Sequence, residues 1–255
     1  MLHFSRAIAR IPGNSLQQGI SSSPGGVPDT QRARRQHHEY IQALEALGLD
    51  VFVLPADEKF PDSVFVEDTA VFMGAGVLVT RPGADTRLGE GMAMRAHLQN
   101  LEHQVVVMQT PGSLDGGDVL LVGKRFFVGL SQRTNGEGLR QFSDAAARFG
   151  YETRAVPVPA GLHLKSGLSL VGEGLLLAAP GCAQDPAFAG LRVLCVPAHE
   201  AYAANSLSVN GTVLVPAGYP ETTSLLQAEG LQTREVDVSE FRKVDGGLSC
   251  LSLRF

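Results

Sequence analysis

The sequence is poor in cysteine, in clustered basic residues and in long apolar runs, and each shortage argues against a class of protein. Its three cysteines, Cys182, Cys195 and Cys250, include no CxxC pair. This sparse set fits a reducing cytosol better than a disulfide framework, so we expect a cytoplasmic protein. Basic residues form no run and the net charge is −5, which argues against a nucleic-acid partner. We expect no membrane span, because no apolar run approaches about 18 residues, and no secretory signal at residues 1–13.

What the sequence does contain is a repeat of short apolar strands joined by Gly-containing turns. Of the turns, Asn210-Gly211 is the strongest hairpin signal, because Asn and Gly tolerate a positive φ. Asp68, Asp118, Ser166 and Asn205 begin equivalent hairpins at intervals of roughly 40–50 residues, the spacing of repeated supersecondary units. The four predicted hairpins lie within residues 65–83, 114–133, 163–181 and 203–220.

Amphipathic segments between the hairpins predict helices. Residues 30–48 carry an apolar stripe, with Thr30 as candidate N-cap and Gly48 as the stop. His37 and His38 lie in this charge-rich segment, and we expect both on the surface. Residues 134–150 and 221–230 predict two further helices, whereas 87–101 predicts a weaker one because Gly89 and Gly91 lower helix propensity.

The two chain ends supply a fifth hairpin. Its first strand is the C-terminal SCLSLRF, and its second is the N-terminal HFSRAIARIP. Pairing the ends removes exposed sheet edges, as closed β architectures do. We therefore predict an α/β fold, a five-bladed α/β propeller of ββαβ-type repeats that forms a single domain over residues 1–255. An open α/β sheet with two free ends is the alternative.

In a ring of like units the strand starts converge on the axis, so polar residues at those starts should meet. Cys250, His163 and a carboxylate would provide a nucleophile, a general acid/base and a group that orients it. Carboxylates left over in a buried centre need a positive partner, which a cationic substrate would supply. The residues expected at the axis are Glu67, Asp68, Asp115, Asp118, His163, Asn205 and Cys250.

Structural explanations compete with each of these assignments. Cys250 and His163 could be core residues, and Asp115 and Asp245 could be turn residues beside glycines. Cys250, His163 and Asp115 could also bind zinc, but no short ligand spacing supports a metal, and we predict none. We expect Cys182 and Cys195 to be structural.

Several segments together resemble one family, the dimethylarginine dimethylaminohydrolases of the guanidine-modifying superfamily. The resemblance runs from about residue 3 to residue 255 in order, and it implies the same five-bladed propeller. It also implies hydrolysis of Nω-methylated arginine to citrulline, without a cofactor. The segments that carry it are FPDSVFVEDTAVF, LDGGDVL, SQRTNGEG, GLHLKSGLSL, YAANSLSVNGTVLVPAGYP and EVDVSEFRKVDGGLSCLSLRF.

The resemblance implies a role for each matching residue. Cys250 would attack the guanidinium carbon, His163 would protonate the leaving amine, and Asp115 would orient His163. Glu67 and Asp68 would hold the guanidinium with support from Asp62. Two departures are minor: some bacterial members carry Glu at position 115, and Leu is common at position 20. The remaining substrate contacts would be Arg87 and Arg133 on the α-carboxylate, and the carbonyls of Ile20 and Val244 on the α-amino group.

Other functions compete with this one. An arginine deiminase, another guanidine-modifying hydrolase or an amidinotransferase would use similar residues, although deiminases are typically longer. A non-catalytic binder on the same scaffold would lack the Cys–His–Asp set. Residues 12–30 are either a mobile lid carrying Ile20 or a solvated connector. The sequence does not fix the preference among methylated and unmodified arginine. It does not fix the oligomeric state either, and it is compatible with a homodimer.

Overall fold

A computed structural model describes residues 3–158 and 161–255 and resolves two compact units. One unit comprises residues 3–65 and 166–255, and the other residues 66–158 and 161–165. We call them the terminal unit and the central unit. In the described residues no helix has the length and apolar character needed to cross a membrane.

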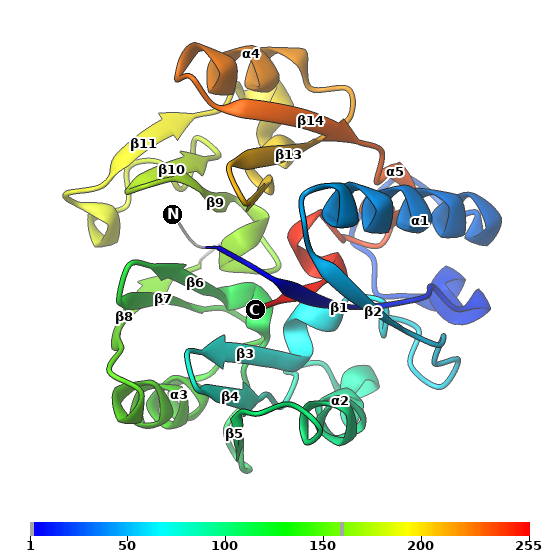
Figure 1. Ribbon diagram of the computed structural model, residues 1–255, viewed down its shortest axis with the longest axis vertical. Coiled ribbons are helices and arrows are strands. Elements are labelled where there is room, and N and C mark those ends of the chain that lie inside the picture. Colours follow the sequence, from blue (N-terminus) through cyan, green and yellow to red (C-terminus); the bar gives the residue numbers. More distant parts are fainter. Residues whose placement is uncertain (1–2, 159–160) are drawn as a thin grey trace. The chain divides into compact units, whose positions relative to one another are not determined.

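Both units are built from one repeated three-stranded sheet. Each sheet has an antiparallel pair followed by a third strand that lies parallel to the middle one, after a crossover that includes a helix or a short 3₁₀ turn (Figure 1). The central unit has two such sheets, β3-β4-β5 and β6-β7-β8, and the terminal unit has three, β9-β10-β11, β12-β13-β14 and β15-β1-β2. The strands are Arg6–Arg10 (β1), Asp50–Leu54 (β2), Ala70–Met73 (β3), Gly76–Val79 (β4), Gln104–Val107 (β5), Val119–Val122 (β6), Arg125–Leu130 (β7), Glu152–Pro157 (β8), Leu168–Gly172 (β9), Leu175–Ala178 (β10), Arg192–Cys195 (β11), Leu207–Val209 (β12), Thr212–Pro216 (β13), Gln232–Val236 (β14) and Leu253–Arg254 (β15).

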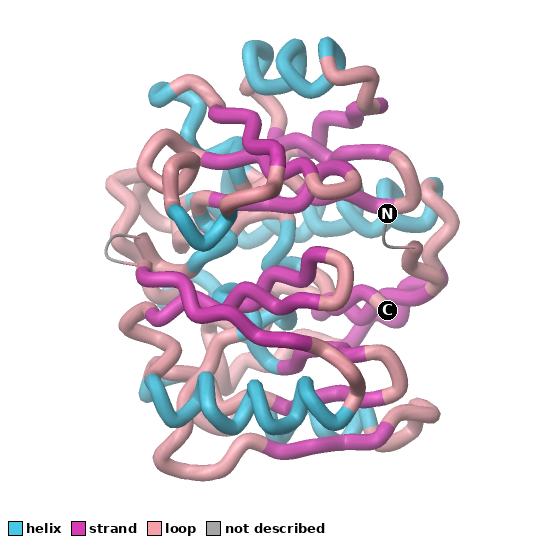
Figure 2. The backbone as a smooth tube through the Cα atoms, turned by 90° about the vertical axis from the view of Figure 1, so that its left-hand side faces the viewer, coloured by secondary structure: helices cyan, strands magenta, loops and turns pink. Residues whose placement is uncertain are grey.

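Each repeat starts as the sequence predicts. A short 3₁₀ turn precedes the first strand of every sheet, so that Asp68, Asp118 and Ser166 lie in such turns and Asn205 directly follows one. The hairpin turn at Asn210-Gly211 has φ of 45° and 94°, the left-handed conformation that this pair favours. Two residues, 74 and 75, join β3 to β4, and Figure 2 shows helices and loops alternating with the strands.

The two ends of the chain pair with each other inside the terminal unit. β15 lies antiparallel to β1, with Ala7 opposite Arg254 and Ile8 opposite Leu253. Tyr40 and Ser252 reinforce this region through a buried hydroxyl–hydroxyl hydrogen bond of 2.7 Å. The predicted fifth hairpin is therefore present, with its strands supplied by opposite ends of the chain.

The predicted helices form, with one correction at an N-cap. Asp29, not Thr30, caps the first helix, because its side chain accepts from the Arg32 N–H at 2.9 Å. The weak segment forms a nine-residue helix despite Gly91, because this glycine allows close packing: a Cβ there would lie 2.3 Å from the Thr80 carbonyl oxygen. The helices are Thr30–Ala46 (α1), Glu90–Leu98 (α2), Gly136–Arg148 (α3), Pro220–Ala228 (α4) and Ser239–Arg242 (α5).

Each unit has its own apolar core. In the terminal unit the buried face of α1 packs with Phe241, Leu248 and Leu251, and in the central unit Phe126 and Phe142 pack edge to face with ring centroids 5.1 Å apart. His38 is exposed as expected, but the prediction for His37 is wrong: its side chain is buried on the inner face of α1. Cys195 is exposed and Cys182 half-buried, so neither is a core residue.

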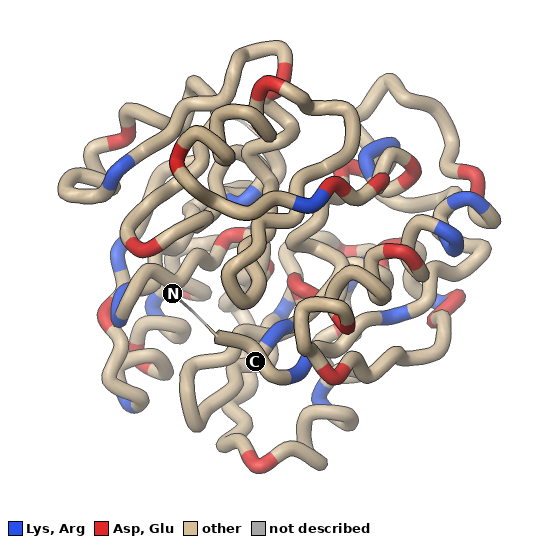
Figure 3. Tube along the Cα trace, turned by 45° about the horizontal axis from the view of Figure 1, so that its top comes forward, with Lys and Arg blue, Asp and Glu red and all other residues tan. Residues whose placement is uncertain are grey.

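Charged side chains are distributed along the chain without a basic tract. Figure 3 shows acidic and basic positions interspersed in the described segments of both units. Several surface pairs are local, such as Arg140 with Glu137 and Asp144 on α3. This pattern agrees with the scattered charge of the sequence.

Candidate active site

The predicted site residues divide between the two units, and each set is described within its own unit. The set in the central unit is rich in charge, and the set in the terminal unit is held mainly by neutral hydrogen bonds. The central unit contains Glu67, Asp68, Arg87, Asp115, Arg133 and His163, and the terminal unit contains Ile20, Asp62, Val244 and Cys250.

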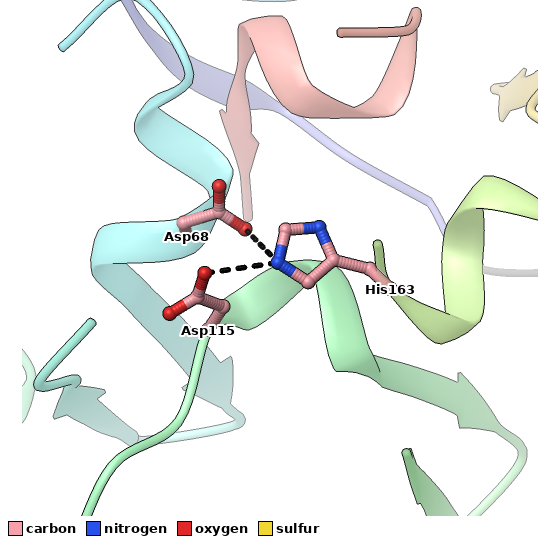
Figure 4. A group of neighbouring side chains, drawn as sticks. All are labelled: Asp68, Asp115 and His163. Carbon is pink, nitrogen blue, oxygen red and sulfur yellow. Dashed lines mark hydrogen bonds and ion pairs between the residues drawn. The ribbon is translucent and has the colours of Figure 1, made fainter. Parts of the chain in front are cut away.

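A buried imidazole–carboxylate pair lies at the centre of the first set. His163 Nε2 is 2.9 Å from Asp115 Oδ2 and 4.0 Å from Asp68 Oδ1 (Figure 4). The other carboxylate oxygen of Asp115 accepts from the Gly83 N–H at 2.8 Å, which fixes its orientation. All three side chains are buried. The structure thus brings Asp115 and His163 together as expected of an orienting carboxylate and a general acid/base.

The two glycines of LDGGD make this packing possible. A Cβ at position 116 would lie 2.0 Å from the Glu67 carbonyl oxygen. A Cβ at position 117 would lie 2.7 Å from His163 Nδ1 and 2.9 Å from Asp68 Oδ1, whereas the Gly117 N–H donates to Asp68 at 2.8 Å. Backbone therefore occupies space that any side chain would take from the imidazole and the carboxylate.

Asp68 is one end of a buried chain of charges. The Arg87 guanidinium donates through Nη1 to Asp68 at 2.5 Å and through Nη2 to Glu90 at 2.7 Å. Glu90 follows Arg87 by three residues and lies in the first turn of α2. All three side chains are at most 5% exposed, so Arg87 compensates two buried carboxylates. The pKa of Arg87 is raised because the two carboxylates outweigh the effect of its burial.

These charges determine the protonation of His163. Burial lowers the pKa of an imidazolium, but the Asp68 charge and the hydrogen bond to Asp115 outweigh burial and raise the pKa of His163 to about 9. Burial alone would raise the pKa of Asp68. The positive charges of His163 and Arg87 outweigh burial and lower this pKa to about 2. At neutral pH His163 is therefore an imidazolium beside the ionised carboxylate of Asp68.

The remaining predicted residues of the central unit differ in their surroundings. Glu67 is buried, and Lys165 Nζ lies 2.6 Å from its Oε1. Arg133 is half-buried, and its backbone N–H donates to Ser131 Oγ. Asp118, expected near the axis, has an anchoring role, because it accepts from Ser131, from Thr134 and from the Leu164 N–H.

The Asp68–Asp115–His163 group could also be considered as a metal site. Its ligand atoms all lie within 4.8 Å of one another. A metal needs the lone pair of a neutral imidazole, whereas the pKa of His163 is raised to about 9. Arg87 already compensates Asp68. The charge pattern is suited to proton transfer, and the absence of a metal stays a prediction.

In the terminal unit a set of neutral contacts fixes the segment around Cys250. Cys250 is half-buried in a 3₁₀ turn over Ser249–Leu251, and its N–H donates to the Gly247 carbonyl at 3.2 Å. Asn205 exchanges two hydrogen bonds with Ser249, and the Tyr202 hydroxyl donates to the Gly246 carbonyl at 2.8 Å. The segment that leads to Cys250 is thus fixed, and Asn205 positions the preceding residue, Ser249.

The other predicted contacts of this unit surround one loop. Asp62 accepts from the Ile20 N–H at 3.1 Å, and Asp245, at φ 57°, accepts from the Ser22 N–H at 2.6 Å. The Ser21 hydroxyl donates to the Lys243 carbonyl, next to buried Val244. The loop over residues 12–30 is therefore bonded to the segment preceding Cys250. Whether it acts as a lid stays a prediction.

The chain matches known proteins over most of its length. The family model described as N,N dimethylarginine dimethylhydrolase, eukaryotic, matches residues 14–188. An N(G),N(G)-dimethylarginine dimethylaminohydrolase of Pseudomonas aeruginosa is 42% identical over 253 residues, which is 99% of this chain and 100% of that protein. The chain belongs to the dimethylarginine dimethylaminohydrolase family.

Solved structures of dimethylarginine dimethylaminohydrolases have the same fold. A Cys-to-Ser mutant of the Pseudomonas aeruginosa enzyme complexed with citrulline superposes with a TM-score of 0.97 at 41% identity, covering 100% of both chains. A His-to-Gly variant in an adduct with S-methyl-L-thiocitrulline gives 0.96 at 41% identity, covering 99% of this chain and 100% of that one. With the five repeated sheets, these matches confirm the predicted five-bladed α/β propeller. That residues 1–255 form one domain stays a prediction.

Several residues of the central cluster were not predicted from the sequence. Glu90 and Lys165 compensate predicted site residues, and Ser131 and Thr134 hold Asp118. Lys165 follows His163 by two residues in GLHLKSG, and Glu90 follows Arg87 by one helical turn. Their closeness in sequence to His163 and Arg87 was the available signal. A solvent-exposed charged residue could occur at the same spacing, so the signal does not identify a buried partner.

Proposed function

We propose that this protein hydrolyses Nω,Nω-dimethyl-L-arginine and Nω-methyl-L-arginine to L-citrulline, releasing dimethylamine or methylamine. Membership of the family supports this reaction. The observation that carries the assignment is the buried His163–Asp115 pair beside Asp68, with the pKa of His163 raised to about 9. Such an imidazolium is a general acid that stays charged at neutral pH.

The first half-reaction forms a covalent intermediate. The Cys250 thiolate attacks the guanidinium carbon and forms a C–S bond, giving a tetrahedral adduct. His163 donates a proton to the dimethylamino nitrogen, the C–N bond breaks, and dimethylamine leaves an S-alkylthiouronium on Cys250. Covalent catalysis divides one difficult substitution into two easier steps. His163 Nε2 donates to Asp115, which leaves the Nδ1 proton for transfer.

The second half-reaction restores the enzyme. Neutral His163 takes a proton from water, and the resulting hydroxide attacks the thiouronium carbon. The C–S bond then breaks and the hydroxyl proton of the adduct passes to water, so the thiolate of Cys250 returns and neutral citrulline is released. The net reaction adds one water and releases one amine, without an oxidant or a cofactor.

The residue numbers of two substituted side chains in related structures support the assignment of Cys250 and His163. The substituted cysteine of the citrulline complex and the substituted histidine of the thiocitrulline adduct are each numbered one lower than these residues. In those proteins the ligands are the product itself and a sulfur analogue of it. We assign the same kind of ligand to this chain.

Carboxylates and arginines divide the substrate contacts in this proposal. Glu67 and Asp68 hold the guanidinium beside the thiolate, with support from Asp62. The α-carboxylate binds Arg133, whose forked guanidinium can bind a carboxylate through two hydrogen bonds. Arg87 assists, although Asp68 and Glu90 already compensate its charge. The carbonyls of Ile20 and Val244 accept from the α-amino group.

The test is citrulline release from dimethylarginine, monomethylarginine and arginine, side by side, with a chelator present. The proposal expects turnover of the methylated substrates and no effect of the chelator. Turnover of arginine alone would assign a deiminase, and no turnover by the folded protein would favour a binding role. A cytoplasmic location, the absence of a nucleic-acid partner and compatibility with a homodimer remain expectations from the sequence.

A further inference from the structure

Lys165 lies where a positively charged substrate is proposed to bind. It follows His163 by two residues, in the 3₁₀ turn Leu164–Ser166, and its Nζ lies 2.6 Å from Glu67 Oε1. The Lys165 side chain is 14% exposed and that of Glu67 is 5% exposed. A carboxylate so deeply buried needs a positive partner, because an unpaired buried charge is strongly unfavourable. Lys165 provides that partner.

The neighbouring acid has a different kind of partner. Asp68 is compensated by Arg87, whose planar guanidinium is fixed between Asp68 and Glu90. A lysine is a compact charge on a flexible four-carbon stem, so it can leave one carboxylate and reach solvent more readily than a clamped arginine. Of the adjacent carboxylates Glu67 and Asp68, Glu67 therefore has the more easily exchanged cation.

We propose that Lys165 is a specificity-determining residue, an internal cation that competes with the guanidinium of the substrate for Glu67. This inference rests on the proposed function. A cationic methylarginine takes over Glu67 and displaces the ammonium, whereas neutral citrulline cannot compensate the carboxylate. Once citrulline has formed, Lys165 pairs with Glu67 again, because the neutral product does not compete for that carboxylate as a cation. Lys165 thus lowers the affinity for the cationic substrate relative to the affinity for the neutral product.

The experiment compares Lys165→Met with the wild type at pH 8. The readout is the KM for dimethylarginine divided by the Ki of citrulline as a competitive inhibitor. Removing the competing charge should lower this ratio about tenfold, the size of one charge-assisted hydrogen bond. A purely structural role would change stability and would leave the ratio unchanged.

Two further variants keep the test decisive. Lys165→Arg retains the charge in a more rigidly hydrogen-bonding group, so the ratio should rise above that of the wild type. This variant still tests the inference if the Met variant fails to fold. Lys124→Met removes a positive charge elsewhere in the central unit, where Lys124 lies over the Tyr151 ring, and should leave the ratio unchanged. An unchanged ratio in the folded Lys165 variants would overturn the inference, whereas absence of citrulline release by the wild type would overturn the proposed function.

Discussion

Two buried histidines, one in each unit, respond to burial in opposite ways. His37 of the terminal unit lies on α1 with its ring centroid 6.4 Å from that of Phe241, and Nε2 has no hydrogen-bond partner among the described residues. Burial, with a smaller contribution from His38, lowers the pKa of His37 to about 4. His163 of the central unit has a pKa raised to about 9. His37 is therefore neutral at pH 7, and His163 is charged.

The difference comes from the groups around each ring, because burial disfavours the charged form of both. Asp68 and Asp115 reverse that effect at His163. His37 has an aromatic neighbour, Phe241, and an exposed histidine, His38, instead. A buried histidine alone therefore indicates nothing about catalysis, whereas a buried histidine with two carboxylates is prepared to donate a proton.

The largest expected effect comes from removing the charge of the orienting carboxylate. Asp115→Asn should reduce kcat about 10²–10⁴-fold, the usual contribution of positioned acid–base catalysis. The pKa of His163 should also fall, so the basic limb of the pH–rate profile should move to lower pH. Steady-state kinetics from pH 6 to 10 measure both effects. An unchanged profile would show that Asp115 does not control His163.

A smaller effect is expected from a single methyl group. Gly117→Ala would place its Cβ against His163 Nδ1 and Asp68 Oδ1. Misplacing reacting groups by about 1 Å can cost about 10²-fold in rate, so we expect a loss of that order in kcat. Gly136→Ala is the matched control, because nothing lies within 4 Å of its Cβ position. Equal activity of the two variants would contradict the described packing.

The charged histidine should stabilise the fold at low rather than high pH. Its folded pKa of about 9 exceeds the ordinary 6.5. The stabilisation is therefore fully present below pH 6.5 and is lost as pH rises through 9, with an upper limit of about 3 kcal/mol. Urea unfolding of wild type and His163→Gln should give a difference in unfolding free energy that shrinks across this window. The exposed His199→Gln variant serves as control, and a difference independent of pH would contradict the raised pKa.

The neutral histidine should show the opposite dependence, with the smallest effect. The folded pKa of His37 is about 4, below 6.5. Stability is therefore complete above pH 6.5 and declines as pH falls toward 4, by about 1–3 kcal/mol. His37→Leu should be less sensitive to acid than the wild type in urea unfolding at pH 7 and 4.5. His38→Leu, on the exposed face of α1, should behave like the wild type. Equal loss of stability at pH 4.5 in the wild type and both variants would show that His37 is not the cause of the acid sensitivity.

The sequence predicted the repeats and the proximity of His163 and Asp115, but not the environment of either histidine. Strand periodicity and the turn at Asn210-Gly211 are local signals, and five such units leave few alternatives for the fold. His37 was placed on the surface because its segment is rich in charge, yet α1 turns this position toward Phe241. Glu90 and Lys165 were missed because a compensating charge differs from a solvated one only in its tertiary contacts.

Cys250 and His163 are the residues proposed to carry out covalent hydrolysis of methylated arginine. Mass spectrometry of wild type, Cys250→Ser and His163→Gly after mixing with dimethylarginine, together with citrulline release, tests both roles at once. We expect citrulline release by the wild type only, with no adduct on the serine variant. Any adduct that accumulates on the histidine variant should lie on Cys250. Citrulline formation by a folded Cys250→Ser protein at the wild-type rate would show that Cys250 is not the nucleophile.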